Sequence, residues 1–212
     1  MKHSSYLLGV DVVAGVDAVD ADTDNEAVLG AAAVAEIEAV TAARPTARSA
    51  KLDGRVLRSE IEGVTDSQWT DFVLALATAT LGSVSASNAM GMFELKPRRM
   101  ADVGLLKNVR CTESPTGRLV WVGDFVAPMT SKKFLSDADA QYRALGDSMR
   151  DYMSRMYDGE IDCDVEALPE GMSLSGALAI LHRCGPTGLR KWLDEDRFSD
   201  TVALYERCNG IF

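Results

Sequence analysis

The segment SASNAMGMFELKPRRMADVG, residues 85–104, is the most distinctive stretch of this 212-residue chain. Its glycines, Gly91 and Gly104, allow backbone conformations that other residues avoid. Pro97 is suited to the first turn of a helix, because its missing N–H is not needed there. The segment therefore predicts a tightly turned loop followed by a short helix over residues 97–106.

Helical patterns dominate on both sides of this loop. Thr65 and Gln68 form a capping-box pattern before an apolar helix over residues 68–82, which we expect to be the buried central helix. Alternating residues around a Ser-Pro-Thr-Gly turn predict one hairpin between Asn108 and Pro128. The sequence thus predicts a mainly α fold of the α+β type with one small β-hairpin. Its remaining helices are expected over residues 136–157, 173–183, 187–193 and 199–208.

The N-terminal part differs in composition from the rest of the chain. Residues 1–23 are rich in valine, glycine and aspartate, and are expected to be an extended arm that binds a neighbouring subunit. An alanine-rich helix is expected to begin at Asp24 and to end before Arg44, and a linker follows. Up to residue 45 there are eight acidic residues against two basic ones, which gives −6 of the net charge of −10. We therefore predict an acidic part over residues 1–53 and a folded domain over residues 54–212.

Charge and hydropathy exclude several classes of protein. A net charge of −10 and a pI near 4.7 oppose general nucleic-acid binding, because phosphates require a basic field. No run of about 18 apolar residues occurs, so no membrane span is expected. Asp11 and Asp17 interrupt the apolar start of the chain, so no signal peptide is expected either.

Neither a metal nor a cofactor is expected. The only histidines are His3 and His182, and the four cysteines lack the CxxC spacing of zinc sites. The stretch DADTDNEAVLGA, residues 20–31, has acids at alternate positions like a calcium loop, but it lacks the central glycine and the closing glutamate. The cysteines are interpreted as buried reduced thiols, with one disulfide as the alternative.

The segment 85–104 resembles part of the lytic transglycosylases and goose-type lysozymes. In that family it reads approximately S-x-x-G-A-x-G-L-M-Q-x-x-P, followed by a helix and a glycine. Asn88 and Glu94 replace the family's first glycine and its glutamine. The positions that keep the register are Ser85, Ala89, Gly91, Pro97 and Gly104.

A second stretch, ALAILHRCGPTGLRKWL at residues 177–193, resembles the family's A-x-A-Y-N-A-G-P-x-x-V-x-x-x-L helix and turn. Gly185 and Pro186 match, whereas His-Arg-Cys replaces Tyr-Asn-Ala. The two motifs, with the hairpin between them, make residues 65–212 similar to a lysozyme-like domain. The resemblance implies a peptidoglycan-binding cleft. Its substrate-binding residues here would be Ser85, Asn88, Met90, Gly91 and His182.

The resemblance also implies a catalytic glutamic acid at the end of the central helix, which protonates the glycosidic oxygen. Thr78 or Thr80 stands at the corresponding position, and a hydroxyl cannot be a general acid near pH 7. Glu94 is the first substitute to consider, because it lies inside the motif. Glu60 or Glu62 would have to fold back over the cleft.

Three functions agree with these features. The first is a structural component of a phage virion, at its tail or baseplate, assembled in the host cytoplasm. It would have a degenerate transglycosylase-like fold that contacts peptidoglycan, and an arm bound to other virion proteins. The second is an active virion-associated transglycosylase or muramidase with Glu94 as its acid. The third is a module that binds peptidoglycan without cleaving it. A basic turn at Lys96, Arg98 and Arg99 is interpreted as solvated, with binding of an anionic glycan as the alternative.

Overall fold

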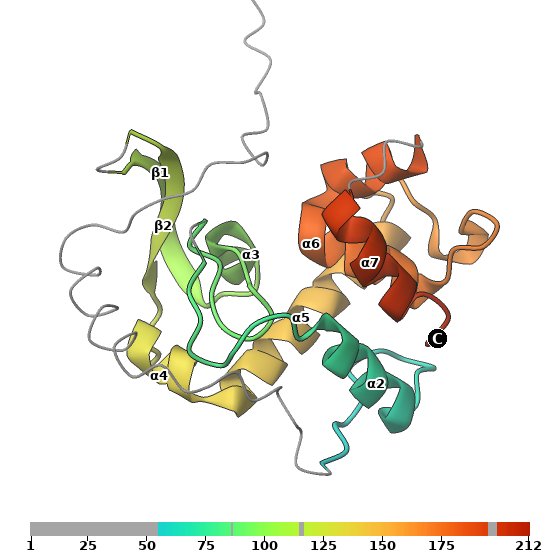
Figure 1. The fold of residues 1–212 in the computed structure, drawn as a ribbon, viewed down its shortest axis with the longest axis horizontal. Coiled ribbons are helices and arrows are strands. Elements are labelled where there is room, and N and C mark those ends of the chain that lie inside the picture. The colour runs from blue at the N-terminus through green and yellow to red at the C-terminus, as the bar shows by residue number, and fades with distance from the viewer. Residues whose placement is uncertain (1–54, 86, 115–116, 195–198) are drawn as a thin grey trace, which may run out of the picture.

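The computed structural model describes residues 55–85, 87–114, 117–194 and 199–212, so the predicted arm, alanine-rich helix and linker lie outside the described residues. The described part is mainly α with one two-stranded antiparallel sheet, as the sequence predicts (Figure 1). In chain order the elements are α2 (Asp66–Leu76), α3 (Pro97–Asp102), β1 (Leu106–Glu113), β2 (Leu119–Phe125), α4 (Ser131–Ser136), α5 (Ala138–Tyr157), the 3-10 turn η1 (Val165–Ala167), α6 (Leu174–Leu193) and α7 (Ser199–Cys208).

The first helix, α2, begins at the predicted capping box but ends earlier than predicted. The Thr65 side chain accepts a hydrogen bond from the Gln68 amide at 3.3 Å, and Gln68 Oε1 accepts one from the Thr65 amide at 3.1 Å. The helix stops at Leu76 rather than near residue 82. Beyond it, the amides of Thr78 and Ala79 both donate to the carbonyl of Met92, a residue of the distant loop, so they are not used to continue the helix.

The central helix of the fold is α5, not α2 as the sequence led us to expect. It has 20 residues against 11 in α2, and Asp137 caps it by accepting from the Ala140 amide at 3.0 Å. In Figure 1 it runs diagonally from α4 toward α6 and α7, and the hairpin and α3 lie beside its first half. Contacts with α3, α4, α6 and η1 agree with this place. The apolar stripe along α5 therefore organises the core.

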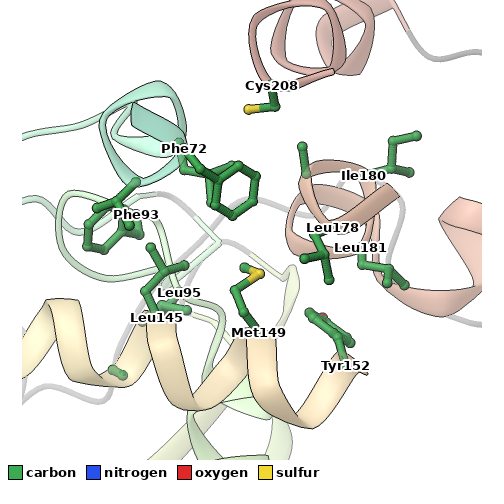
Figure 2. Packing of buried hydrophobic residues seen from close by; sticks show 14 of the residues in the cluster. Phe72, Phe93, Leu95, Leu145, Met149, Tyr152, Leu178, Ile180, Leu181 and Cys208 are labelled. Atoms are coloured by element: carbon green, nitrogen blue, oxygen red, sulfur yellow. The ribbon is translucent and has the colours of Figure 1, made fainter. Parts of the chain in front are cut away.

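The core joins four parts of the chain around α5. Figure 2 shows Phe72 of α2 facing Leu145 and Met149 of α5 and Leu178 of α6. Phe93 and Leu95, from the loop before α3, are each only 1% exposed and belong to the same cluster. The loop is therefore held by its own buried side chains. Among the described residues, no helix has the length and apolar character needed to cross a bilayer.

The hairpin formed by β1 and β2 confirms the predicted one. Its register pairs Leu106 with Phe125 and Glu113 with Leu119, and a β-bulge lies between Lys107 and Arg110. At the bulge a Cβ on Gly123 would lie 2.8 Å from Val109 Cγ2, so a side chain does not fit there.

The C-terminal helices follow the prediction. The element α6 consists of the two helices expected on either side of Gly185, which meet at a kink where that residue has a non-helical backbone (φ 71°, ψ −175°). Gly185 therefore ends the first helix and turns the chain into the second. The short helix α4 was not predicted. Cys111, Cys163, Cys184 and Cys208 are all free thiols.

Candidate functional site

Three segments far apart in the sequence meet beyond the C-terminal end of α2. The Met92 carbonyl accepts from the amides of Thr78 and Ala79, both at 3.1 Å. The Thr78 hydroxyl donates to Glu94 Oε2 at 3.1 Å. The first half of α6 supplies the third segment through His182 and Arg183, described below. We call this meeting point the polar junction and define it by the side chains of Thr78, Glu94, His182 and Arg183.

The carboxylate of Glu94 is held from two sides. Arg183 Nη1 lies 3.3 Å from Glu94 Oε2, the oxygen that also accepts from Thr78. The side chains of Glu94 and Arg183 are 28% and 41% exposed, so this ion pair is within reach of solvent. A half-exposed pair of this kind contributes little to stability. The arrangement therefore fixes a charged group at the surface of the domain.

The backbone at Glu94 adopts a left-handed conformation, with φ of 50°. This conformation costs a residue with a Cβ about 1 kcal/mol relative to glycine. It arises because the loop closes tightly: Met90 and Leu95 form an isolated antiparallel bridge, and the Glu94 amide donates to the Gly91 carbonyl at 3.2 Å. Glu94 therefore has a backbone conformation that is unfavourable for a residue with a side chain.

His182 lies beneath the same loop and is neutral. Its Nε2 is 2.7 Å from the carbonyl of Phe93, and because a carbonyl only accepts, Nε2 carries the ring proton. The other nitrogen, Nδ1, is buried without a hydrogen-bond partner. Burial lowers the pKa of His182 from 6.5 to about 4, and the positive charges of Arg183, Arg99 and Lys96 act in the same direction, whereas the bond to Phe93 opposes them. The ring is therefore an uncharged group with one unused acceptor.

The other residues implied as substrate-binding lie on the same loop, where the structure gives each an internal partner. Ser85 Oγ accepts from the Ala89 amide at 3.1 Å. Asn88 is 2% exposed, and its Nδ2 donates to the Trp121 carbonyl on β2 at 3.1 Å. Met90 is buried in the core. Of the predicted set, the structure brings only Glu94 and His182 to the polar junction.

Gly91 is required by packing within the domain. A Cβ at this position would lie 2.2 Å from Oε1 of Gln141, a residue of α5 that is 1% exposed. The same Oε1 accepts from the Met92 amide at 2.8 Å, and Gln141 Nε2 donates to the carbonyls of Leu81 and Phe134, both at 2.9 Å. This buried amide ties the loop to α5, and no side chain at residue 91 leaves room for it.

The upstream carboxylates considered as alternative acids lie elsewhere. Glu60 packs against Gly146 of α5 and is 3.7 Å from Arg150. Glu62 is exposed. None of the hydrogen bonds or ion pairs of the described residues connects either carboxylate with the polar junction.

The basic turn is not solvated throughout, and this corrects the sequence interpretation. The Arg99 side chain is 8% exposed and lies between α3 and α5. Its Nε is 2.5 Å from Ser148 Oγ, its Nη1 is 2.5 Å from Asp151 Oδ2, and its guanidinium stacks 3.7 Å from the centre of the Tyr152 ring. Arg98 is exposed and stacks on Trp121 at 4.6 Å. Arg99 is thus a structural cation, which the spacing of charges in the sequence does not reveal.

Sequence reasoning did not identify Arg183 as a member of the site. Its only signal was its place beside His182 in the second motif. Within the described part of the chain, no group of three or more His, Cys, Asp or Glu residues is arranged to bind a metal ion.

No protein-family model matches this chain, and neither a curated protein nor a solved structure matches it. A functional assignment therefore depends on the geometry of the polar junction.

Proposed function

We propose that residues 54–212 form a lysozyme-like domain that has lost its catalytic acid, and that the chain is a structural component of a phage virion, at its tail or baseplate. One observation carries the proposal. The three segments that the resemblance assigns to an active site meet at the polar junction, which includes Thr78, one of the two threonines that the resemblance aligns with the proton donor. A convergence of these segments is what a transglycosylase-like fold requires.

The state of Glu94 favours a domain that does not cleave. Glycosidic cleavage needs a carboxyl that holds a proton toward the leaving oxygen. Glu94 Oε2 instead accepts hydrogen bonds from a hydroxyl and from a guanidinium. Both donors engage the same oxygen, so Oε2 is held by groups of the protein itself. In this arrangement Glu94 is an acceptor, suited to holding a ligand hydroxyl or amide.

The virion setting comes from the resemblance and from the acidic N-terminal part. Lysozyme-like domains joined to subunit-binding arms fit a particle that meets the cell wall during infection. The six excess negative charges before residue 46 would favour contacts of this part with basic surfaces of other virion proteins. Crosslinking of intact particles tests this directly, because residues 1–45 should crosslink to a second virion protein. Crosslinks restricted to the chain itself would remove the assembly role.

A wall assay tests the loss of cleavage. Purified sacculi should bind the full-length protein in a sedimentation assay and should release no soluble muropeptides after long incubation. The variants Glu94→Gln and Arg183→Leu test whether the polar junction takes part in binding to sacculi. The matched control is Arg143→Leu, because Arg143 is an exposed arginine of α5. Failure to bind sacculi, without release, would leave a purely structural role.

The second candidate function is active cleavage with Glu94 as the acid. It is favoured by one observation: the Glu94 carboxylate lies within hydrogen-bonding distance of Thr78, one of the two threonines that the resemblance aligns with the acid. Muropeptide release that is lost in Glu94→Gln and kept in the Arg143→Leu control would establish it and overturn the preferred proposal.

A further inference from the structure

The outer edge of β1 carries no partner in the described part of the chain. The sheet has only two strands, so alternate residues of β1 direct their N–H and C=O groups away from β2. On β2, by contrast, the carbonyl of Trp121 accepts from Asn88. Apart from Arg110 Nη1 donating to the Asn108 carbonyl, no hydrogen bond within the described residues joins the β1 main chain to anything but β2. Such an edge is ready to accept a further strand.

The hairpin is also poorly covered for a two-stranded sheet. Leu106 and Val120 are buried, but Cys111 and Glu113 are exposed, and Leu119 near the turn is 50% exposed. Two strands alone are marginally stable in water, and a third strand or a packed helix is needed for independent stability. The helix α3 contacts the hairpin, yet much of β1 stays open. A third strand would supply the missing contacts.

The charges on β1 select an acidic strand. Lys107 and Arg110 are exposed, and neither forms a salt bridge within the described residues. From residue 96 to residue 125 the chain has six basic residues against three acidic ones, although its net charge is −10. The stretch GVDVVAGVDAVD, residues 9–20, has the opposite character: it combines five valines with three aspartates and no basic residue. Valine favours strands, and aspartates would face the β1 cations.

The tether between the two is long enough for pairing within one chain. The described residues begin at Arg55, whose side chain is 2.7 Å from Asp139 at the start of α5. The neighbouring helix α4 packs against the base of the hairpin, where the rings of Phe134 and Phe125 are 5.9 Å apart. With the expected helix over residues 24–43, the 34 residues from 21 to 54 can span up to about 75 Å, whereas β1 is about 26 Å long. A linked segment is present at an effective concentration on the order of millimolar, which a second copy does not reach in dilute solution.

We propose that residues 9–20 of this chain dock along the outer edge of β1 in the same molecule, as a third strand of the sheet. This inference goes beyond the proposed function and does not rest on it, because it uses only the hairpin edge and the sequence of the N-terminal part. Docking of this kind adds main-chain hydrogen bonds for affinity and uses the β1 cations for selectivity.

Amide hydrogen exchange of the full chain tests the proposal. β1 amides that do not donate to β2 exchange at nearly the unstructured rate on a bare edge, and should be slowed at least about tenfold if a strand covers them. Val12→Pro with Val16→Pro removes two donors of the docking segment and should abolish this protection. Val12→Thr with Val16→Thr keeps the strand-forming character and is the matched control. Protection of α5 amides confirms that each variant is folded.

Charge variants and molecular mass complete the experiment. Arg110→Glu should accelerate exchange at the outer edge, whereas Arg143→Glu on α5 should not. Light scattering should find a monomer at the concentration used. Equal exchange rates in the wild type and the proline variant would overturn the proposal. Protection that rises with concentration, together with a dimer, would also overturn it by making a second copy the occupant. The wall assay is independent, so either proposal can fail alone.

Discussion

The buried ring of His182 predicts a loss of stability in mild acid, with a size that follows from the structure. Burial beside three cations lowers its pKa from 6.5 to about 4. Above pH 6.5 the ring is neutral in both the folded and the unfolded chain, so it makes no pH-dependent contribution. Between pH 6.5 and pH 4 the unfolded chain takes up a proton that the folded chain does not bind. The free energy of unfolding therefore decreases as the pH is lowered through this range. The loss is complete below pH 4 and amounts to about 3 kcal/mol.

Urea unfolding followed by tryptophan fluorescence measures this effect if a non-titrating variant is compared. His182→Gln can still donate to the Phe93 carbonyl, but it cannot take up a proton in this range. Carboxylates titrate equally in both proteins, so the difference between the two free energies isolates His182. This difference should shrink by about 3 kcal/mol between pH 7 and pH 4. If the free energies of unfolding of the two proteins changed in parallel with pH, the reasoning would be refuted. An NMR titration that gave His182 a pKa near 6.5 would refute it as well. His3 is the only other histidine, and a His3→Gln variant assigns the signals.

Three further measurements by chemical denaturation follow from the packing, the first two as matched pairs of variants. Gly91→Ala should lose about 3 kcal/mol because its Cβ would meet a buried glutamine at 2.2 Å, whereas Gly104→Ala, with open space and only a positive φ, should lose about 1 kcal/mol; equal losses would contradict the packing argument. Arg99→Met should cost about 3 kcal/mol by leaving buried acceptors unpaired, and Arg98→Met less than about 1 kcal/mol. The reverse order would show that the buried cation is not structural. Glu94→Gly relieves about 1 kcal/mol of backbone strain and loses an ion pair of similar value, so stability should change by less than about 1 kcal/mol. A loss above about 2 kcal/mol would make that carboxylate a structural group.

Local signals predicted the elements, and long-range contacts decided where they end. The capping box at Thr65 and the cap at Asp137 each involve residues that are close together in the sequence. Both helix starts were therefore predictable. The end of α2 was not, because its following amides bond to Met92, a residue of the later loop. The central place of α5 depends on its length and on which helices contact it, and neither follows from the apolar character of α2.

The candidate site was predictable only in part for the same reason. The motif pointed to Glu94 and His182, and both lie at the polar junction. The pairing of Glu94 with Arg183 crosses 89 residues, and the burial of Arg99 depends on Ser148, 49 residues away. Single-residue chemistry cannot distinguish a buried arginine from a solvated one, because the partners that stabilise it come from another helix.

The geometry of the polar junction is maintained by buried apolar residues next to it in the sequence. Glu94 lies between Phe93 and Leu95, each 1% exposed, and His182 follows Leu181, which is fully buried. Burial of these neighbours brings the loop and α6 together whatever the side chain at residue 94 or at residue 78. Loss of the carboxylate at residue 94 should therefore cost the fold little, since its half-exposed pair with Arg183 adds less than about 1 kcal/mol. The shape of this part of the domain thus depends on its apolar neighbours, and the polar side chains of the junction can change without changing the fold.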